Sequence, residues 1–188
     1  NYVMEFINKK DMRSVEKFIK YFQDTCKHLK YCKNPVISAP SGLALGGGEE
    51  VLLQSNYVIS HTNIVMGLVE TIVGLVPAGG GCKELLWRWT QVNNSKNDID
   101  FASLKVFDII GKAKTATSPY EARPLLFLNS NNQVIINRNN LFSVARNLIE
   151  KNRDFKPPAY CKFKLSGSQV RQKMQKVLDD LYNRKIIL

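Results

Sequence analysis

Gly42-Leu43-Ala44-Leu45-Gly46-Gly47-Gly48-Glu49-Glu50 is the stretch that decides the fold, and it follows a short apolar run, Pro35-Val36-Ile37-Ser38-Ala39-Pro40. The apolar run predicts a buried strand that ends in a turn at Ser41-Gly42. We expect a helix to begin within the glycine triplet, where the first turn leaves several backbone N–H groups unpaired and glycine lets a ligand approach them. Such a helix end attracts negative charge, either a fixed phosphate or an oxyanion that forms during a reaction.

Acidic residues follow the glycine triplet at two places. Glu49 and Glu50 lie in the first turn of the expected helix, and Glu70 interrupts an apolar run over residues 64–76. A buried carboxylate costs free energy unless it is paired or functional. Taken alone, the glycine-rich turn is equally consistent with a tight connection whose acids compensate the helix dipole. Glu70 alone is consistent with a structural acid that pairs with Lys or Arg.

Several sequence blocks, taken in order, resemble the crotonase superfamily of enoyl-CoA hydratases and isomerases. The blocks are residues 35–39, residues 44–48 with an acid at Glu50, Met66-Gly67 with Glu70 three positions on, and Gly74 and Pro77 before Gly79-Gly80-Gly81. The resemblance implies an α/β fold of the crotonase type, with a partial ββα spiral core and a helical C-terminal region. It predicts the later part of that core in residues 1–128 and a basic helical extension in residues 129–188.

The resemblance also implies roles for single residues. The backbone N–H of Gly47 would be one of two oxyanion-hole donors to a thioester carbonyl. Glu50 and Glu70 would hold a water between them and add it across an α,β-double bond. Turn residues that would shape the acyl pocket and support the acid are Leu45, Gly46, Gly48, Pro77, Gly79 and Gly80. The substrate would be an acyl-coenzyme A thioester, and no further cofactor is expected.

Three functions stay open from the sequence. The first is hydration of an enoyl-CoA in fatty-acid β-oxidation, as part of a hydratase and 3-hydroxyacyl-CoA dehydrogenase system. The second is enoyl-CoA isomerisation, which needs one proton-shuttling acid and no bound water. The third is a non-catalytic fragment or assembly module that needs a partner segment.

The two ends of the chain bear on these alternatives. The sequence begins at Asn1 without an initiator methionine, so we expect an upstream segment or a companion chain to supply the first strands, much of the CoA pocket and the second oxyanion donor. A homo-oligomer is also open. The end beyond Pro157 resembles the crotonase-type portion of bacterial proteins that also carry a 3-hydroxyacyl-CoA dehydrogenase. Any dehydrogenase chemistry would reside elsewhere, because no G-x-G-x-x-G with a following acid occurs.

Charge is unevenly placed in a chain of 188 residues, which is long enough for one domain. The net charge is +11, and residues 151–188 hold ten Lys or Arg against three Asp. A solvated basic face is the default interpretation, with an acidic partner or CoA phosphates as alternatives. We do not expect nucleic acid as a partner, because the basic residues lack an aromatic-rich recognition motif.

Cysteine and histidine spacing predicts no metal site. Cys26, Cys32, Cys82 and Cys161 are scattered, and the two histidines join them in no ligand pattern. Reduced thiols and the absence of an evident signal peptide favour a cytoplasmic location. The weakly charged stretch over residues 51–82 carries too many polar residues to span a bilayer.

Periodicity predicts the remaining elements. We expect one helix over residues 2–29, or two joined near Lys10-Asp11, and a strand at residues 57–60. Asn56 stands where crotonase relatives commonly carry aspartate. Further along we expect helices at residues 82–89 and 101–110, a loop at 92–97, a capping box at Ser118-Pro119-Tyr120-Glu121, a short apolar piece at 134–136, a helix capped by Asn140 and running to about Lys151, and a helix at 168–184.

Overall fold

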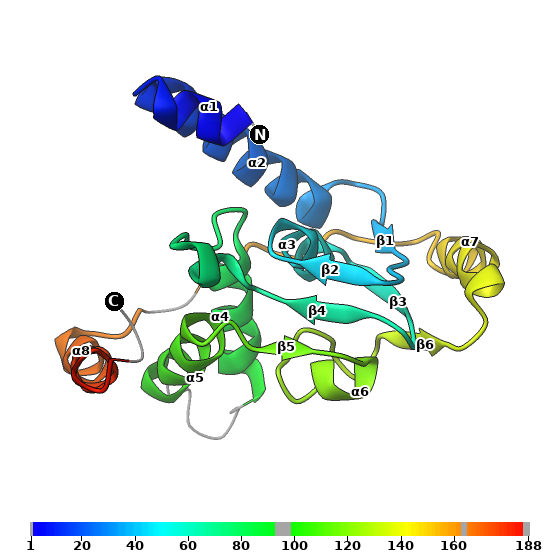
Figure 1. The fold of residues 1–188 in the computed structure, drawn as a ribbon. Coiled ribbons are helices and arrows are strands. Elements are labelled where there is room, and N and C mark those ends of the chain that lie inside the picture. Colours follow the sequence, from blue (N-terminus) through cyan, green and yellow to red (C-terminus); the bar gives the residue numbers. More distant parts are fainter. Residues whose placement is uncertain (1, 93–98, 163–164, 186–188) are drawn as a thin grey trace.

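A computed structural model describes residues 2–92, 99–162 and 165–185. Of the predicted loop at residues 92–97, all but Val92 lies outside these described residues. Figure 1 shows short strands in the middle of the molecule, with the N-terminal helices over one side and further helices at both ends. This arrangement is the α/β architecture that the sequence predicts.

The N-terminal amphipathic pattern forms two helices, α1 (Tyr2–Asn8) and α2 (Met12–Tyr31). The break lies where it was predicted: Lys10 takes a positive φ of 56°, and Asp11 caps α2 by accepting a hydrogen bond from the backbone N–H of Ser14 at 3.1 Å. α2 packs on the helix that begins in the glycine triplet, which brings the long N-terminal helix onto the part of the chain that carries the candidate site.

Within the described residues, six short strands form two three-stranded sheets. Their bounds are β1 (Ile37–Ser38), β2 (Leu43–Leu45), β3 (Tyr57–His61), β4 (Val65–Gly67), β5 (Thr115–Ala116) and β6 (Gln133–Ile135). One sheet has the order β1-β3-β6 and is parallel, and the other has the order β2-β4-β5, in which β4 runs parallel to β2 and antiparallel to β5. The predicted strand at residues 57–60 is confirmed, whereas the run from Pro35 contributes only two residues of strand.

Gly46 turns the chain from β2 into α3 (Gly47–Gln54). Its φ is 57°, a left-handed conformation that glycine adopts without steric cost, and its N–H donates to the carbonyl of Gly67 at 2.8 Å. The prediction that a helix begins within the glycine triplet is therefore confirmed. Because the turn is bonded to the end of β4, the first turn of α3 lies next to the segment that leads to Glu70.

From Glu70 onward the chain forms mostly helices. These are η1 (Glu70–Val73), α4 (Gly81–Val92), α5 (Ile99–Gly111), α6 (Pro119–Ala122), η2 (Arg138–Asn140), α7 (Leu141–Lys151) and α8 (Ser168–Asn183). The capping box is confirmed, because Ser118 Oγ accepts from the N–H of Glu121 at 3.3 Å. The predicted helix to Lys151 is confirmed, with Asn140 at the N-cap position of α7, but the Asn140 side chain makes no capping bond; Asn137 caps the short η2 turn before it.

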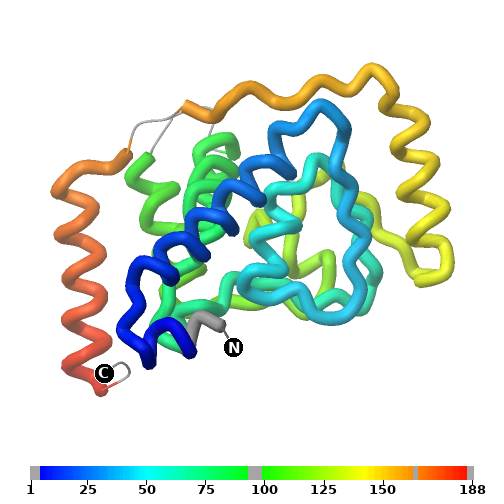
Figure 2. The backbone as a smooth tube through the Cα atoms, turned by 90° about the horizontal axis from the view of Figure 1, so that it is seen from above, coloured from blue at the N-terminus to red at the C-terminus, as the bar shows by residue number. Residues whose placement is uncertain are grey.

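The C-terminal region both completes a sheet and wraps the molecule. β6 pairs with β3, so residues 133–135 belong to the sheet, and a domain boundary at residue 128 stays a prediction. In Figure 2, α7 and α8 lie at opposite edges and the segment between them crosses the molecule past the end of α2. The Tyr160 ring from this segment lies 4.4 Å from the Tyr31 ring of α2, centroid to centroid.

Apolar residues from the strands and from α3, α4 and α5 form the core. Ile64, Met66, Leu68 and Leu85 are fully buried. Each such side chain contributes about 1.5–3 kcal/mol through removal of its surface from water. No helix in the described ranges is long and apolar enough to cross a membrane.

Gly67→Ala tests the close approach of β4 to β5. A Cβ at Gly67 would lie 2.9 Å from the carbonyl oxygen of Lys114 and 2.9 Å from Cγ2 of Thr115. We expect the free energy of unfolding, measured in urea, to fall by about 1–3 kcal/mol because the two strands must separate. Gly111→Ala is the matched control, since a Cβ there meets nothing within 4 Å. Equal stability of both variants would contradict this packing.

Candidate active site

The glycine triplet presents free backbone donors at the start of α3. Gly47 is the first residue of the helix, so its N–H has no intrahelical acceptor. The neighbouring residues predicted for the site lie around this N–H. Leu45 ends β2 in register with Gly67, and Gly46 makes the turn into the helix. A Cβ at Gly48 would meet nothing within 4 Å. The helix start can therefore accept a carbonyl oxygen or another negatively charged group.

Glu50 is buried and held by two backbone amides. Its Oε2 accepts from the N–H of Gly79 at 2.9 Å, and its Oε1 accepts from the N–H of Gly81 at 2.7 Å. The residue is only 2% exposed. The glycine turn thus supports the acid, as predicted from the sequence for Gly79 and Gly80, but Gly81 donates the second bond. Gly80 contributes its positive φ of 107°, and the buried Pro77 precedes the turn.

Glu70 lies beside the Gly46 turn, and its carboxyl group makes no hydrogen bond to another side chain among the described residues. Both carboxyl oxygens are buried, without a partner among the described residues, so the alternative of a Lys or Arg ion pair is not seen. One oxygen lies 3.4 Å from where a Cβ of Gly46 would stand. Burial raises the pKa of Glu70, and the nearby Glu50 charge adds to the shift. A carboxyl group with a raised pKa keeps its proton to a higher pH than an ordinary glutamate, which suits a group that must deliver one.

Phe22 is a site residue that the sequence analysis missed. Its ring on α2 reaches both glycine turns, because a Cβ at Gly79 would lie 2.4 Å from Cε1 and one at Gly47 would lie 3.4 Å from Cζ. The aromatic ring therefore walls the space beside Glu50, and Gly79 must lack a side chain. The only signal in the sequence was the place of Phe22 on the apolar face of the N-terminal helix.

Glu49 is a second buried acid beside the site. It is 0% exposed, and neither carboxyl oxygen has a hydrogen-bond partner among the described residues. Burial raises its pKa well above the ordinary value, Arg88 opposes that shift, and Glu70 adds to it. An unpaired carboxyl in this position stays protonated, because ionisation would leave a charge without solvent.

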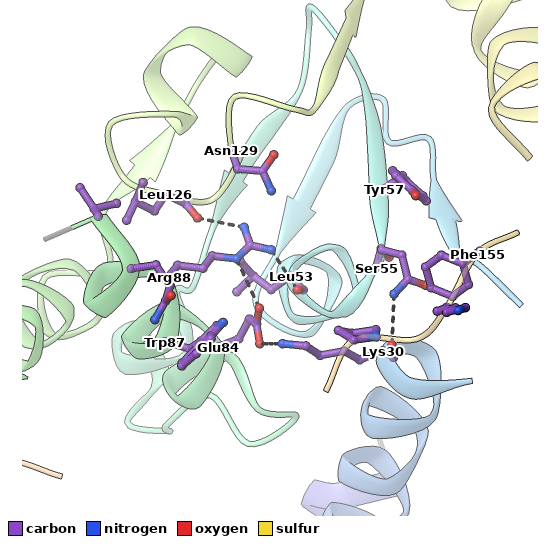
Figure 3. Close-up of a pocket in the computed structure, with 15 residues that line it drawn as sticks. Lys30, Leu53, Ser55, Tyr57, Glu84, Trp87, Arg88, Leu126, Asn129 and Phe155 are labelled. Atoms are coloured by element: carbon purple, nitrogen blue, oxygen red, sulfur yellow. Dashed lines mark hydrogen bonds and ion pairs between the residues drawn. The ribbon is translucent and has the colours of Figure 1, made fainter. Parts of the chain in front are cut away.

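A buried ion-pair network supports α4 behind the site. Glu84 pairs with Lys30 of α2 and, at 3.5 Å, with Nε of Arg88. Arg88 also donates to the carbonyls of Leu53 and Phe127 at 2.9 and 2.8 Å. Figure 3 shows Lys30 and Arg88 approaching Glu84 from opposite sides, at the edge of a cavity of about 510 Å³. Periodicity could not reveal this network, because it joins helices that are far apart in the sequence.

Asn56 takes part in the same region through neutral hydrogen bonds. Its Nδ2 donates to the carbonyl of Lys30 at 3.1 Å, and its Oδ1 accepts from the N–H of Val36 at 2.8 Å. The amide thus links the end of α2 to Val36, the residue directly before β1.

Within the described ranges, no group of three or more His, Cys, Asp or Glu side chains is placed to hold a metal ion.

Solved structures with the same fold include enoyl-CoA hydratases. The hydratase from Bacillus anthracis aligns with a TM-score of 0.59 and 24% identity, covering 77% of this chain and 50% of that protein. The model of the enoyl-CoA hydratase/isomerase family matches residues 4–91, which include Gly47, Glu50 and Glu70. The chain thus has a crotonase-type fold, and its residues 4–91 are similar to the enoyl-CoA hydratase/isomerase family.

Two curated relatives are much longer proteins. The chain is 36% identical over 157 residues to a probable 3-hydroxyacyl-CoA dehydrogenase of Bacillus subtilis, covering 81% of this chain and 19% of the relative. It is 36% identical over 118 residues to a putative fatty acid oxidation complex trifunctional enzyme of Rickettsia felis, covering 63% and 16%. The chain thus spans less than a fifth of each relative's length.

The pH dependence of stability tests the state of Glu49. The folded chain keeps the Glu49 proton to a higher pH than the unfolded chain, whose carboxyl titrates near 4.5. Above that pH the folded state binds more protons, so this group's contribution to the free energy of unfolding falls as pH rises. We expect the free energy of unfolding of Glu49→Gln to fall less with rising pH than that of the parent. The variant should therefore be increasingly more stable than the parent between pH 4.5 and 7.5.

Urea unfolding at several pH values measures this effect. Glu16→Gln, at an exposed position of α2, is the matched control for the chemical change. A parent and a Glu49→Gln variant whose unfolding free energies run parallel across the range would show that Glu49 is not a neutral, unpaired acid in the folded chain.

Proposed function

We propose that this chain forms the acid-bearing part of an enoyl-CoA hydratase that adds water to an α,β-unsaturated acyl-CoA in fatty-acid β-oxidation. The observation that carries the proposal is the presence of two unlike acids near each other: Glu50 is anchored by the amides of Gly79 and Gly81, while the carboxyl oxygens of Glu70, which the Glu50 charge influences, have no side-chain partner among the described residues. The family match and the relatives named for fatty-acid oxidation support the substrate class.

In the proposed mechanism, the Gly47 N–H polarises the thioester carbonyl as one oxyanion-hole donor. Glu50 orients a water and accepts its proton, and the water oxygen bonds to the β-carbon. Glu70 delivers a proton to the α-carbon, so one water is added in all. The protein needs no cofactor for this step, since the CoA thioester itself supplies the activated carbonyl. The second oxyanion donor would come from a preceding segment or a companion chain.

The buried environment suits these roles. Burial and the Glu50 charge raise the pKa of Glu70, which helps it to hold the proton that it delivers. The two amides on Glu50 fix its orientation without the side-chain entropy that a flexible partner would lose. The Phe22 ring covers both glycine turns and excludes water from one side of the acids.

Enoyl-CoA isomerisation is the second candidate. It needs only one acid that moves a proton between carbons, and the free oxygens of Glu70 would suffice for it. The anchored Glu50 favours hydration, because an isomerase has no water to orient.

We also propose that the protein is located in the cytoplasm and that it assembles with a companion segment or as a homo-oligomer. Residues 129–188 would form a helical extension.

Hydration of crotonyl-CoA tests the function, followed by the loss of the conjugated thioester absorbance. We expect Glu70→Gln and Glu50→Gln each to lower the rate by about 10²–10⁴-fold, since each removes a proton-transfer group. Glu121→Gln, which alters an exposed capping acid on α6, is the matched control and should keep the parent rate.

The outcomes separate the alternatives. Conversion of a 3-enoyl-CoA to the conjugated 2-enoyl thioester, lost in Glu70→Gln but near the parent rate in Glu50→Gln, supports the isomerase. A parent chain that neither binds nor hydrates crotonyl-CoA supports a non-catalytic module. One missing oxyanion donor costs roughly a hundredfold or more in rate, so the assay needs enough enzyme to detect the reduced turnover.

A further inference from the structure

A second cavity adjoins the candidate site on the side of Gly79. Its volume is about 410 Å³, and we call it the lysine cavity. It lies between α2, the glycine turn and the segment that crosses the molecule between α7 and α8. The residues that matter to the argument are Lys27, Tyr31, Gln54, Gly79, Lys83 and Cys161.

The charge around the lysine cavity is positive. Two of its lining residues are lysines, and none of the described lining residues is Asp or Glu. Lys27 Nζ lies 5.5 Å from the centre of the Tyr160 ring, and Lys83 Nζ lies 6.0 Å from that of Tyr31. Neither lysine has an acidic partner within 4.0 Å in the part of the chain that the structure describes. The two ammonium groups are available to an anion.

The floor of the lysine cavity has unused hydrogen-bonding capacity. Gln54 is only 2% exposed, and its Oε1 has no partner among the described residues. Its Nε2 makes only a long contact of 3.5 Å with the carbonyl of Gly80. The group of Gln54 that can serve an anion is Nε2, because it carries two N–H donors and makes only this one long contact, whereas Oε1 can only accept.

The lysine cavity adjoins the residues that hold Glu50. Gly79 lines the cavity and donates its N–H to Glu50. Gln54 follows Glu50 by one turn on the same face of α3, a rise of about 5–6 Å. The cavity therefore lies next to the acid, on the other side of the glycine turn.

We propose that the lysine cavity binds a carboxylate at the far end of the acyl group, so that the substrate class is an unsaturated acyl-CoA with a second, terminal carboxylate. This inference rests on the proposed function: with Gly47 at the thioester carbonyl and Glu50 at the β-carbon, the remaining carbons leave on the Gly79 side. Lys27 and Lys83 supply charge, and Gln54 supplies an amide at the floor.

Binding of saturated acyl-CoA pairs tests the proposal without depending on turnover. Adipyl-CoA and hexanoyl-CoA have the same chain length and differ in the terminal carboxylate, and coenzyme A alone is the third probe. By calorimetry we expect adipyl-CoA to bind the full chain about tenfold more tightly than hexanoyl-CoA, as one charge-assisted hydrogen bond allows. Lys83→Met and Lys27→Met should each reduce that preference several-fold and leave hexanoyl-CoA affinity unchanged.

Two further variants separate charge from structure. Lys83→Arg keeps the charge and should keep most of the preference, whereas Lys17→Met removes an exposed lysine elsewhere on α2 and should change nothing. Thermal unfolding confirms that each variant is folded.

Each contrary outcome has a distinct meaning. Equal affinity for adipyl-CoA and hexanoyl-CoA in the parent overturns the inference and leaves the proposed function standing. Weaker binding of coenzyme A itself in the lysine variants shows that the lysines contact CoA phosphates, which also overturns it. Failure of all three probes to bind overturns the proposed function, and this inference with it.

Discussion

Two hydrogen bonds from the glycine turn to Glu50 hold the candidate site together. They join α3 to a turn 29 and 31 residues further along the chain, and they place a buried carboxylate between two backbone donors. Because both carboxylate oxygens are satisfied, the acid can stay buried at little cost. The same bonds align the start of α4 with α3, so the position of the turn and the position of the acid depend on each other.

Close backbone approach is the condition for this arrangement. A side chain at Gly79 would collide with the Phe22 ring and with Glu50, and one at Gly81 would lie 3.0 Å from both Glu50 and Leu68. Glycine is therefore required for contact rather than for backbone flexibility at these two positions. The Phe22 ring occupies the space that the missing side chains leave, which links the N-terminal helix to the chemistry.

Buried charge is distributed around this centre in two different ways. The carboxyl groups of Glu49 and Glu70 have no ion-pair partner in the described part of the chain, and burial raises the pKa of each. Glu84, by contrast, is paired with Lys30 and Arg88 and stabilises the contact between α2 and α4. A paired acid such as Glu84 stabilises the contact between helices, whereas an unpaired acid beside the glycine turn, such as Glu70, is suited to proton transfer.

Local patterns in the sequence determined the elements and the short-range parts of the site. The glycine triplet before an acid predicted the start of α3, Asp11 marked the helix break, and the Ser118 box predicted a capped turn, because each depends on residues within a few positions. The tertiary structure alone decided which amides hold Glu50, that Phe22 covers the glycines, and that Lys30 pairs with Glu84. These contacts join segments far apart in the chain, and periodicity carries no information about which faces meet.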